Sequence, residues 1–332
     1  MKTSIINNWK LSLQSPLKDI IIKYVDYKEA MGIKLPPIIR FMIKLDTLVA
    51  SLNIEGVSLP DEIAIEWNKL QDNENVNTRY KRMVYLKDFA RFAQFHNIDA
   101  RIPKIPKCNK HGYIPYIFSK EEMDRIFYHC DRLYVHRKYY DSSKFVMPAL
   151  IRLLYGSGMR IGECLTLKNR DVKLTEGVVI LRNTKNKTER LVPLSISIRE
   201  VLKDYATAKE RFGLAKLDDE PFFVSPCGQR VLPASVRNHF KTVLVRAKIT
   251  HTQTIRVHDL RHTFCVHALA NMSLQGMDIY VCLPLLMQYV GHKTIAATNY
   301  YVRLTEDRYP NILKSMEEYG CVFPDIDNPE YL

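Results

Sequence analysis

The chain has 332 residues, of which 46% are hydrophobic and 26% charged, and these proportions exclude a fibrous or disordered protein. Its basic side chains outnumber the acidic ones by 49 to 36, and the excess extends along the chain. Residues 1–110 hold 18 basic and 12 acidic side chains, and the other 222 residues hold 31 and 24. The length predicts two domains, and the charge of both parts predicts a polyanionic partner.

The seven cysteines are odd in number and include no C-x-x-C pair, which argues against a disulfide framework or a zinc ribbon. The first residues, MKTSIINNWKLSL, lack the apolar core of a signal peptide. Apolar stretches such as FVMPALIRLLYG are shorter than the roughly 18 residues that a membrane span needs. We therefore expect a cytoplasmic protein that has no membrane partner and that associates with the nucleoid if the polyanion is DNA.

Residues 16–96 have the pattern of helices throughout. Apolar residues recur at helical spacing in SPLKDIIIKYVDYKEAMG, PPIIRFMIKLDTLVASL, LPDEIAIEWNKL and NTRYKRMVYLKDFARFAQF. The last segment mixes basic and aromatic side chains, a pattern typical of a phosphate-facing helix and equally of a solvated basic face. Its candidate DNA-binding residues are Arg79, Lys81, Arg82 and Lys87.

A proline-containing basic segment follows and predicts an extended linker over residues 101–112. Beyond it, GVVILRN and ERLVPL flank the polar TKNKT and predict a β-hairpin, PFFVS predicts a further short strand, and helices dominate the rest. We expect a mainly α protein with a small antiparallel sheet. The expected parts are a helical domain at 14–100, the linker, an α+β domain at 113–320, and a tail at 321–332.

Four clusters in the second part carry side chains suited to phosphate chemistry, although each cluster alone is ordinary. YGSGMRIGECLTL places an arginine after a glycine-rich break with a glutamate three residues on, and TKNKT places two lysines at a hairpin tip. VHDLRHTFCVHALA sets a histidine and an arginine at i, i+3, and YVGHKTIAATNYY places a histidine nine residues before a tyrosine. The residues are Arg160, Glu163, Lys185, Lys187, His258, Arg261, His292 and Tyr301.

Taken together, these motifs resemble the tyrosine site-specific recombinases of the phage integrase family. The order is R-I-G-E, a hairpin lysine, H-x-x-R, G-H and a late tyrosine. The resemblance covers about residues 113–303 by motif, and over residues 1–100 it rests on helical character and position. It implies a two-domain, C-shaped DNA clamp in which residues 14–100 bind the core site and residues 113–320 are catalytic.

The chemistry of DNA cleavage explains why these residue types occur together. A phosphodiester under attack gathers negative charge on its non-bridging oxygens, and the forked guanidinium groups of Arg160 and Arg261 can each donate two hydrogen bonds to them. His258 and His292 would add donors and help to manage the proton of the nucleophile. We further expect the two arginines to favour the phenolate of a neighbouring tyrosine, whose pKa is ordinarily about 10.

The resemblance also implies a 3′-phosphotyrosyl intermediate and a 5′-hydroxyl leaving group that needs a proton. Alignment of ERLVPL with the second hairpin strand of the family selects Lys185 as the donor, with Lys187 in reserve. Glu163 occupies the acidic position after the first arginine and would orient Arg160 or a neighbour. Adjacent helical residues point about 100° apart, so Tyr300 and Tyr301 cannot both face one phosphate. The spacing of the family selects Tyr301 and assigns Tyr300 to packing.

Two other interpretations compete with this resemblance. His258 and His262 have the i, i+4 spacing of a zinc hydrolase, but Asp259 replaces the expected glutamate and Arg261 would repel a metal dication. A catalytically inactive DNA-binding relative would show a broken set of residues, and this set is whole.

The family assignment carries expectations about assembly and cofactors. It implies double-stranded DNA recombination sites as the partner and a homotetramer whose protomers exchange a C-terminal segment, here EDRYPNILKSMEEYGCVF. We expect no cofactor and no catalytic metal. Integration, excision or transposition of a mobile element is the predicted role, while chromosome-dimer resolution and DNA inversion use the same chemistry. We expect no separate arm-binding domain before residue 14, which argues against one of the larger phage integrases.

Overall fold

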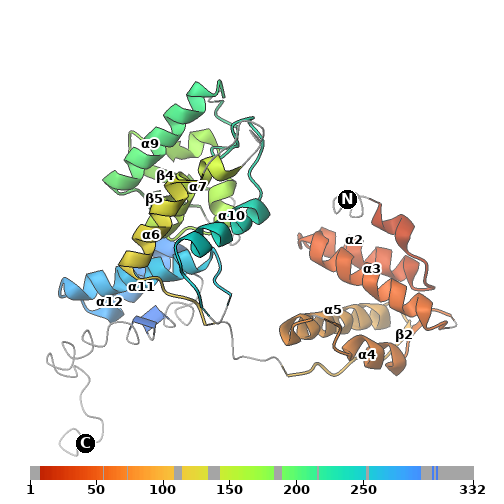
Figure 1. Ribbon diagram of the computed structural model, residues 1–332. Coiled ribbons are helices and arrows are strands. Elements are labelled where there is room, and N and C mark those ends of the chain that lie inside the picture. The colour runs from red at the N-terminus through yellow and green to blue at the C-terminus, as the bar shows by residue number, and fades with distance from the viewer. Residues whose placement is uncertain are drawn as a thin grey trace, which may run out of the picture. The chain divides into compact units, whose positions relative to one another are not determined.

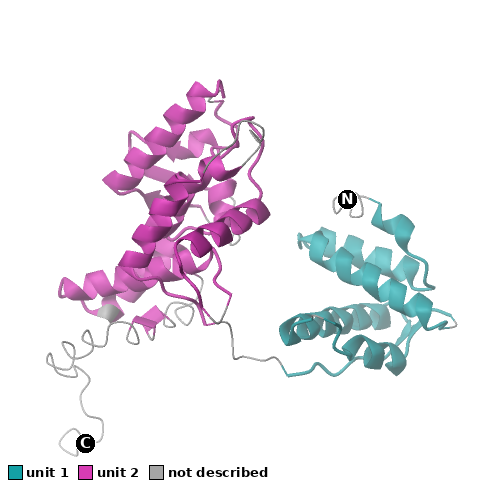
Figure 2. Ribbon diagram, in the orientation of Figure 1, with its two compact units in different colours: residues 1–113 teal, residues 114–332 magenta. Residues whose placement is uncertain are grey.

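The computed structural model describes residues 8–54, 56–72, 74–107, 114–133, 143–182, 189–214, 217–251, 254–292, 301, 302, 304 and 305. The chain divides into two compact units, residues 1–113 and 114–332 (Figure 2). In the described residues, no helix is long and apolar enough to cross a membrane.

The described residues of unit 1 form four α-helices (Figure 1). A 3₁₀ turn at Trp9–Ser12 precedes α2 (Lys18–Ala30), α3 (Leu35–Ser51), α4 (Asp61–Asn68) and α5 (Val76–Phe95). Strand β1 (Ser58–Leu59) pairs in parallel with β2 (Asp99–Ala100), a contact that the all-helical prediction for this region omitted. The helices enclose one apolar core with Leu45, Trp67 and Phe89 among its buried members.

One of the four candidate DNA-binding residues in unit 1 is buried. Arg82 is 1% exposed. Its Nε donates to Glu74 Oε1 at 2.8 Å, its Nη2 to Glu74 Oε2 at 2.6 Å and to the Lys69 carbonyl at 2.9 Å, and its Nη1 to the Trp67 carbonyl. The prediction that Arg82 contacts a phosphate is therefore wrong, because its donors are used inside the unit and its charge is balanced by Glu74. Lys81 is exposed, and Arg79 and Lys87 are half-buried on the same helix.

Unit 2 combines helices with a three-stranded antiparallel sheet in the order β3-β4-β5 (Figure 1). Its helices are α6 (Lys120–Asp131), η3 (Ser143–Val146), α7 (Met147–Ser157), α8 (Ile161–Leu165), η4 (Asn169–Asp171), α9 (Ile196–Arg211), α10 (Pro233–Arg246), α11 (Asp259–Leu274) and α12 (Ile279–Val290). Its strands are β3 (Val172–Lys173), β4 (Val178–Leu181) and β5 (Arg190–Pro193).

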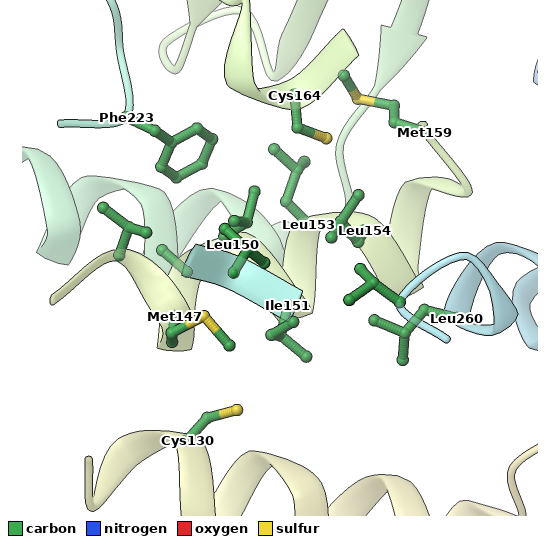
Figure 3. Packing of buried hydrophobic residues seen from close by; sticks show 14 of the residues in the cluster. Cys130, Met147, Leu150, Ile151, Leu153, Leu154, Met159, Cys164, Phe223 and Leu260 are labelled. Carbon is green, nitrogen blue, oxygen red and sulfur yellow. The ribbon is translucent and has the colours of Figure 1, made fainter. Parts of the chain in front are cut away.

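Helix α7 is the centre of unit 2, and its sequence explains why. MPALIRLLYGS is apolar around most of its circumference, as expected of a helix that is buried on several sides. It packs against α6, α9 and α11. Figure 3 shows Leu150, Leu153 and Leu154 among side chains that α6, α8 and α11 contribute to the same core. The C-terminal end of α7, which leads to the first arginine motif, is therefore packed into the core of unit 2.

The mainly helical fold with a small antiparallel sheet is confirmed. The predicted hairpin is present, with Val179 opposite Val192 and Leu181 opposite Arg190. The predicted strand at PFFVS is wrong: among the described residues, this segment makes only isolated bridges, Lys168 with Pro221 and Val224 with Arg230. Phe222 and Phe223 are both buried, so the apolar run reflects burial on two sides rather than a place in the sheet.

Candidate active site

The first arginine motif begins where α7 ends at Gly158. This glycine has φ +60°, and a Cβ atom there would lie 2.4 Å from Cδ1 of Phe264 on α11, so only glycine fits. Arg160 follows as the N-cap residue of α8. The sharp turn places its half-buried side chain beside the end of α12, where its Nη2 lies 3.5 Å from the Gly291 carbonyl.

Glu163 is shared between two arginines. Its Oε1 accepts from Arg160 Nη1 at 2.7 Å and its Oε2 accepts from Arg190 Nη2 at 2.9 Å. Burial raises the pKa of this carboxyl, but hydrogen bonds from the Arg160 amide and the Arg190 guanidinium outweigh burial and hold it below its ordinary value. One negative charge is thus shared by two guanidinium groups, and the three side chains together keep a net positive charge.

Arg261 lies in the first turn of α11 and is 2% exposed. Its Nη1 donates to the Gly158 carbonyl at 2.6 Å and its Nη2 donates to the Val290 carbonyl at 2.8 Å. Both carbonyls belong to the C-terminal ends of helices, α7 and α12, where the helix dipoles are negative. Among the described residues, Arg261 has no carboxylate within 4.0 Å, so two helix ends hold its charge without neutralising it.

The end of α12 is a second place where glycine is needed. Gly291 has φ +69°, and a Cβ atom there would lie 2.8 Å from Arg190 Nη1. The chain therefore turns tightly over the Arg190 guanidinium before it reaches His292. His292 then lies close enough to Arg261 and Arg160 for their charges to lower its pKa.

Three histidines gather around the arginines. His258 is the exposed N-cap residue of α11, and its ring lies edge-on to that of His262 with centroids 4.9 Å apart. Burial, followed by the charges of nearby residues, lowers the pKa of His262 to about 3 and that of His292 to about 4. Desolvation by the surrounding protein, followed by the charge of Arg261, lowers the pKa of His258 to about 4. All three imidazoles are therefore neutral at pH 7 in the DNA-free chain, each with one donor and one acceptor nitrogen.

Tyr301 is buried among these groups. Its Oη lies 3.1 Å from His262 Nδ1, and its ring is stacked at 8° against that of His292 with centroids 5.8 Å apart. Burial, followed by the Cys265 thiol, raises the pKa of Tyr301 well above its ordinary value, while Arg261 acts in the opposite direction. Arg261 therefore favours the phenolate, as expected, but burial outweighs it in the DNA-free chain and the net pKa is raised.

The structure brings together most of the side chains that the sequence singled out in unit 2. They are Arg160, Glu163, His258, Arg261, His292 and Tyr301. Lys185, Lys187 and Tyr300 lie outside the described residues, as does the whole segment predicted to be exchanged between protomers. Sequence reasoning missed the roles of two residues here: Arg190, and His262 as a contact of Tyr301. The signal for His262 was its position directly after Arg261.

A zinc site at His258 and His262 would need a further ligand, and the described residues supply none. No group of three or more histidine, cysteine, aspartate or glutamate side chains gathers there in a way that could hold a metal ion. His258 and His262 instead contact each other edge-on beside a buried guanidinium. The arrangement is suited to donating hydrogen bonds to an oxyanion rather than to binding a cation.

Comparison with known proteins gives a family match over more than half of the chain. The sequence pattern of the phage integrase family matches residues 117–308. A putative integrase/recombinase, y4rB, of Sinorhizobium fredii (strain NBRC 101917 / NGR234) is 24% identical over 91% of this chain and 98% of its own length.

Two solved structures share the fold. The XerH site-specific recombinase bound to palindromic difH substrate, in a post-cleavage complex, aligns with a TM-score of 0.63 and 18% identity over 91% of this chain and 85% of that one. The Tn1549 transposon integrase (residues 82–397, Y379F) in complex with transposon right end DNA aligns with a TM-score of 0.61 and 17% identity over 90% of this chain and 100% of that one.

Proposed function

This chain belongs to the phage integrase family and is a tyrosine recombinase, which cleaves and rejoins DNA, and from this premise we propose which residues perform the reaction. Tyr301 attacks the scissile phosphate and forms a 3′-phosphotyrosyl intermediate, and a second strand reverses the step. The observation that carries the assignment is the position of the Tyr301 hydroxyl, buried within the cluster of arginine and histidine side chains.

The two arginines stabilise the charge that develops on the phosphate. Arg261 is fixed by two carbonyls and keeps its positive charge, and Arg160 shares a single carboxylate with Arg190. Donors that are held in place before the reaction need no reorganisation when charge develops, and the loss of one such donor typically costs about 10²–10³ in rate. His258 and His292 add hydrogen bonds to the same oxygens.

The leaving 5′-oxygen takes its proton from Lys185, with Lys187 as the alternative. Strands β4 and β5 hold the two ends of the segment that carries both lysines. General acid catalysis is typically worth about 10²–10⁴ in rate, so Lys185→Ala should slow cleavage greatly and weaken DNA binding little. A substrate with sulfur at the bridging 5′-position leaves as a stable thiolate and should restore the rate of Lys185→Ala but not that of Arg261→Ala. Rescue of Lys187→Ala alone would transfer the role to Lys187.

Covalent capture tests the activity and identifies the DNA site at the same time. The wild-type protein is incubated with nicked duplexes of randomised sequence, from which the short 5′-hydroxyl fragment diffuses away after cleavage. We expect protease-sensitive, detergent-resistant adducts, whose sequence converges over repeated rounds, in excess EDTA and without nucleotide. Failure to form an adduct would contradict the proposal, and adducts that need zinc would favour the hydrolase interpretation.

The biological role that we favour is integration, excision or transposition of a mobile element. Support comes from the nearly full-length similarity to a protein described as a putative integrase/recombinase. The protein would act as a tetramer on two duplexes, with the exposed Lys81 and the half-buried Arg79 and Lys87 of α5 contacting phosphates. A plasmid whose marker is flanked by the captured site should lose the marker when the protein is expressed. Resolution of plasmid dimers at a single captured site, without excision, would favour the chromosome-dimer role instead.

A further inference from the structure

A hydrogen bond links the proposed nucleophile to a histidine outside the set that the family motif selects. His262 Nδ1 lies 3.1 Å from the hydroxyl oxygen of Tyr301. The two rings are tilted by 45° with centroids 5.6 Å apart, so the contact runs between the edge of the imidazole and the phenol oxygen. His262 is half-buried on α11, one residue after Arg261.

The surroundings of Tyr301 create a need for a proton acceptor. A phenol must lose its proton as its oxygen attacks phosphorus, and burial makes this loss harder. Arginine side chains only donate hydrogen bonds and cannot take a proton. A neutral imidazole can take one if an unprotonated nitrogen faces the hydroxyl within about 2.6–3.2 Å, which His262 Nδ1 satisfies when the imidazole proton is on Nε2.

The two other histidines contact different groups in the cluster. The rings of His258 and His262 meet edge-on, and His258 is exposed at the start of α11. His292 is stacked nearly parallel to the ring of Tyr301, a geometry that orients the phenol. The contacts therefore differ among the three imidazoles: His258 contacts the ring of His262, His292 stacks on the ring of Tyr301, and Nδ1 of His262 faces the phenol oxygen.

We propose that His262 is a catalytic residue of the cleavage step and accepts the phenol proton of Tyr301 at Nδ1. The inference rests on the proposed function, in which Tyr301 is the nucleophile. As the bond between Oη and phosphorus forms, the Oη–H bond breaks and its proton moves to Nδ1. The bond between phosphorus and the 5′-oxygen breaks, and that oxygen takes a proton from the hairpin lysine. On rejoining, the 5′-hydroxyl attacks phosphorus and gives its proton to the lysine, and His262 returns its proton to the phenol oxygen, so both groups recover their starting states.

DNA binding strengthens His262 as a base. In the DNA-free chain, burial and the charges around Arg261 make this imidazole weakly basic. A phosphodiester that enters between Arg160 and Arg261 brings a negative charge, which offsets those charges and favours the protonated imidazole. The proton acceptor is thus strengthened when substrate is present, so the buried tyrosine stays protonated until DNA arrives.

Single-turnover cleavage of the captured nicked duplex tests the assignment. His262→Leu fills a similar volume without an acceptor and should slow cleavage by about 10²–10⁴-fold while DNA affinity changes less than about threefold. His262→Asn places an amide oxygen near the Nδ1 position, where it can hold the phenol but cannot keep its proton. It should therefore stay slow, within about tenfold of the leucine variant. The 5′-bridging sulfur substrate should not rescue either variant, because it relieves only the leaving group.

A matched control lies on the same helix. His267 Nδ1 is 2.9 Å from the hydroxyl of Tyr155, a similar contact away from the phosphate cluster. His267→Leu should lower the thermal midpoint yet cleave at nearly the wild-type rate, which separates a packing defect from loss of the proton acceptor. Wild-type rates in His262→Leu would overturn the assignment, and so would wild-type rates in His262→Asn, which would reduce His262 to a positioning residue. A wild-type protein that forms no adduct would instead overturn the proposed function itself.

Discussion

Each unit of the molecule contains an almost completely buried arginine, and the two are used in opposite ways. Arg82 in unit 1 and Arg261 in unit 2 are 1% and 2% exposed. Arg82 is paired with a carboxylate by two hydrogen bonds and also donates to two carbonyls. Arg261 donates to two carbonyls at helix ends, and in the described part of the chain no carboxylate lies within 4.0 Å of it.

The difference shows that burial alone does not reveal what an arginine does. Removing a charge from water costs free energy, and a neighbouring carboxylate offsets this cost but leaves no net charge for a ligand. Helix C-termini offset part of the cost through partial charges and leave the guanidinium cationic. We infer that Arg82 stabilises unit 1, whereas Arg261 holds a positive charge in readiness for a phosphate.

The largest expected effect is on stability, at Arg82. Arg82→Met leaves the Glu74 carboxylate buried without its partner, which should cost about 3–5 kcal/mol in the free energy of unfolding. Denaturant unfolding of the full chain, with hydrogen exchange on α4 and α5, measures the loss. Adding Glu74→Gln should recover much of it, because the double variant buries no unpaired charge. A double variant as unstable as Arg82→Met would show that the ion pair does not account for the loss.

Arg261 should show the reverse pattern. Arg261→Met should reduce single-turnover cleavage by about 10²–10³-fold, equivalent to about 2.7–4 kcal/mol of transition-state stabilisation. Its unfolding free energy should fall less than that of Arg82→Met, because no buried carboxylate loses its partner. Equal losses of stability in the two variants would contradict the distinction between a structural and a catalytic buried arginine.

A smaller effect is expected at Arg190, which competes with Arg160 for Glu163. Without Arg190, the carboxylate pairs with Arg160 alone and holds that guanidinium away from the phosphate. Arg190→Met should therefore slow cleavage by about tenfold, as is usual for residues that orient a reacting group. Glu163→Gln in the same chain should restore part of the rate. A double variant slower than Arg190→Met would show that Glu163 does not restrain Arg160.

The smallest expected effect is a pH dependence in unit 1. Burial raises the pKa of Glu74, but the hydrogen bonds from Arg82 outweigh it and place the pKa below its ordinary value. A depressed pKa means that the pair stabilises unit 1 fully above the pKa of the unfolded carboxyl and progressively less as pH falls through the folded pKa. Unfolding from pH 7 to pH 3 should show this loss in the wild type. The same loss in the Arg82→Met, Glu74→Gln double variant would assign it to other carboxyls.

Local patterns in the sequence were sufficient to predict elements whose contacts are close along the chain. The hairpin of β4 and β5 was predicted because apolar alternation flanks a polar loop, and the helices of unit 1 were predicted from their periodicity. The β1–β2 pair was not predicted, because each strand has two residues and the partners are about 40 positions apart. A strand of two residues carries no periodicity, so only the folded core determines that pairing.

Side-chain surroundings were harder to predict than side-chain identity. The motif selected Arg160, Arg261 and Tyr301, and the structure places them in one cluster. The sequence did not indicate that Arg82 faces the core, because the sequence of a basic helix looks the same whether a given arginine points inward or outward. The net rise in the pKa of Tyr301 was not predicted for a related reason, because burial depends on contacts that form only on folding.

If Tyr301, and not its neighbour, is the nucleophile, the covalent adduct must carry the nucleotide on Tyr301. Wild-type protein is captured on the selected nicked duplex, digested with protease and nuclease, and the modified peptide is sequenced by mass spectrometry. We expect a nucleotide on Tyr301, full capture by Tyr300→Phe and no capture by Tyr301→Phe. A nucleotide on Tyr300, or capture that survives Tyr301→Phe, would contradict it.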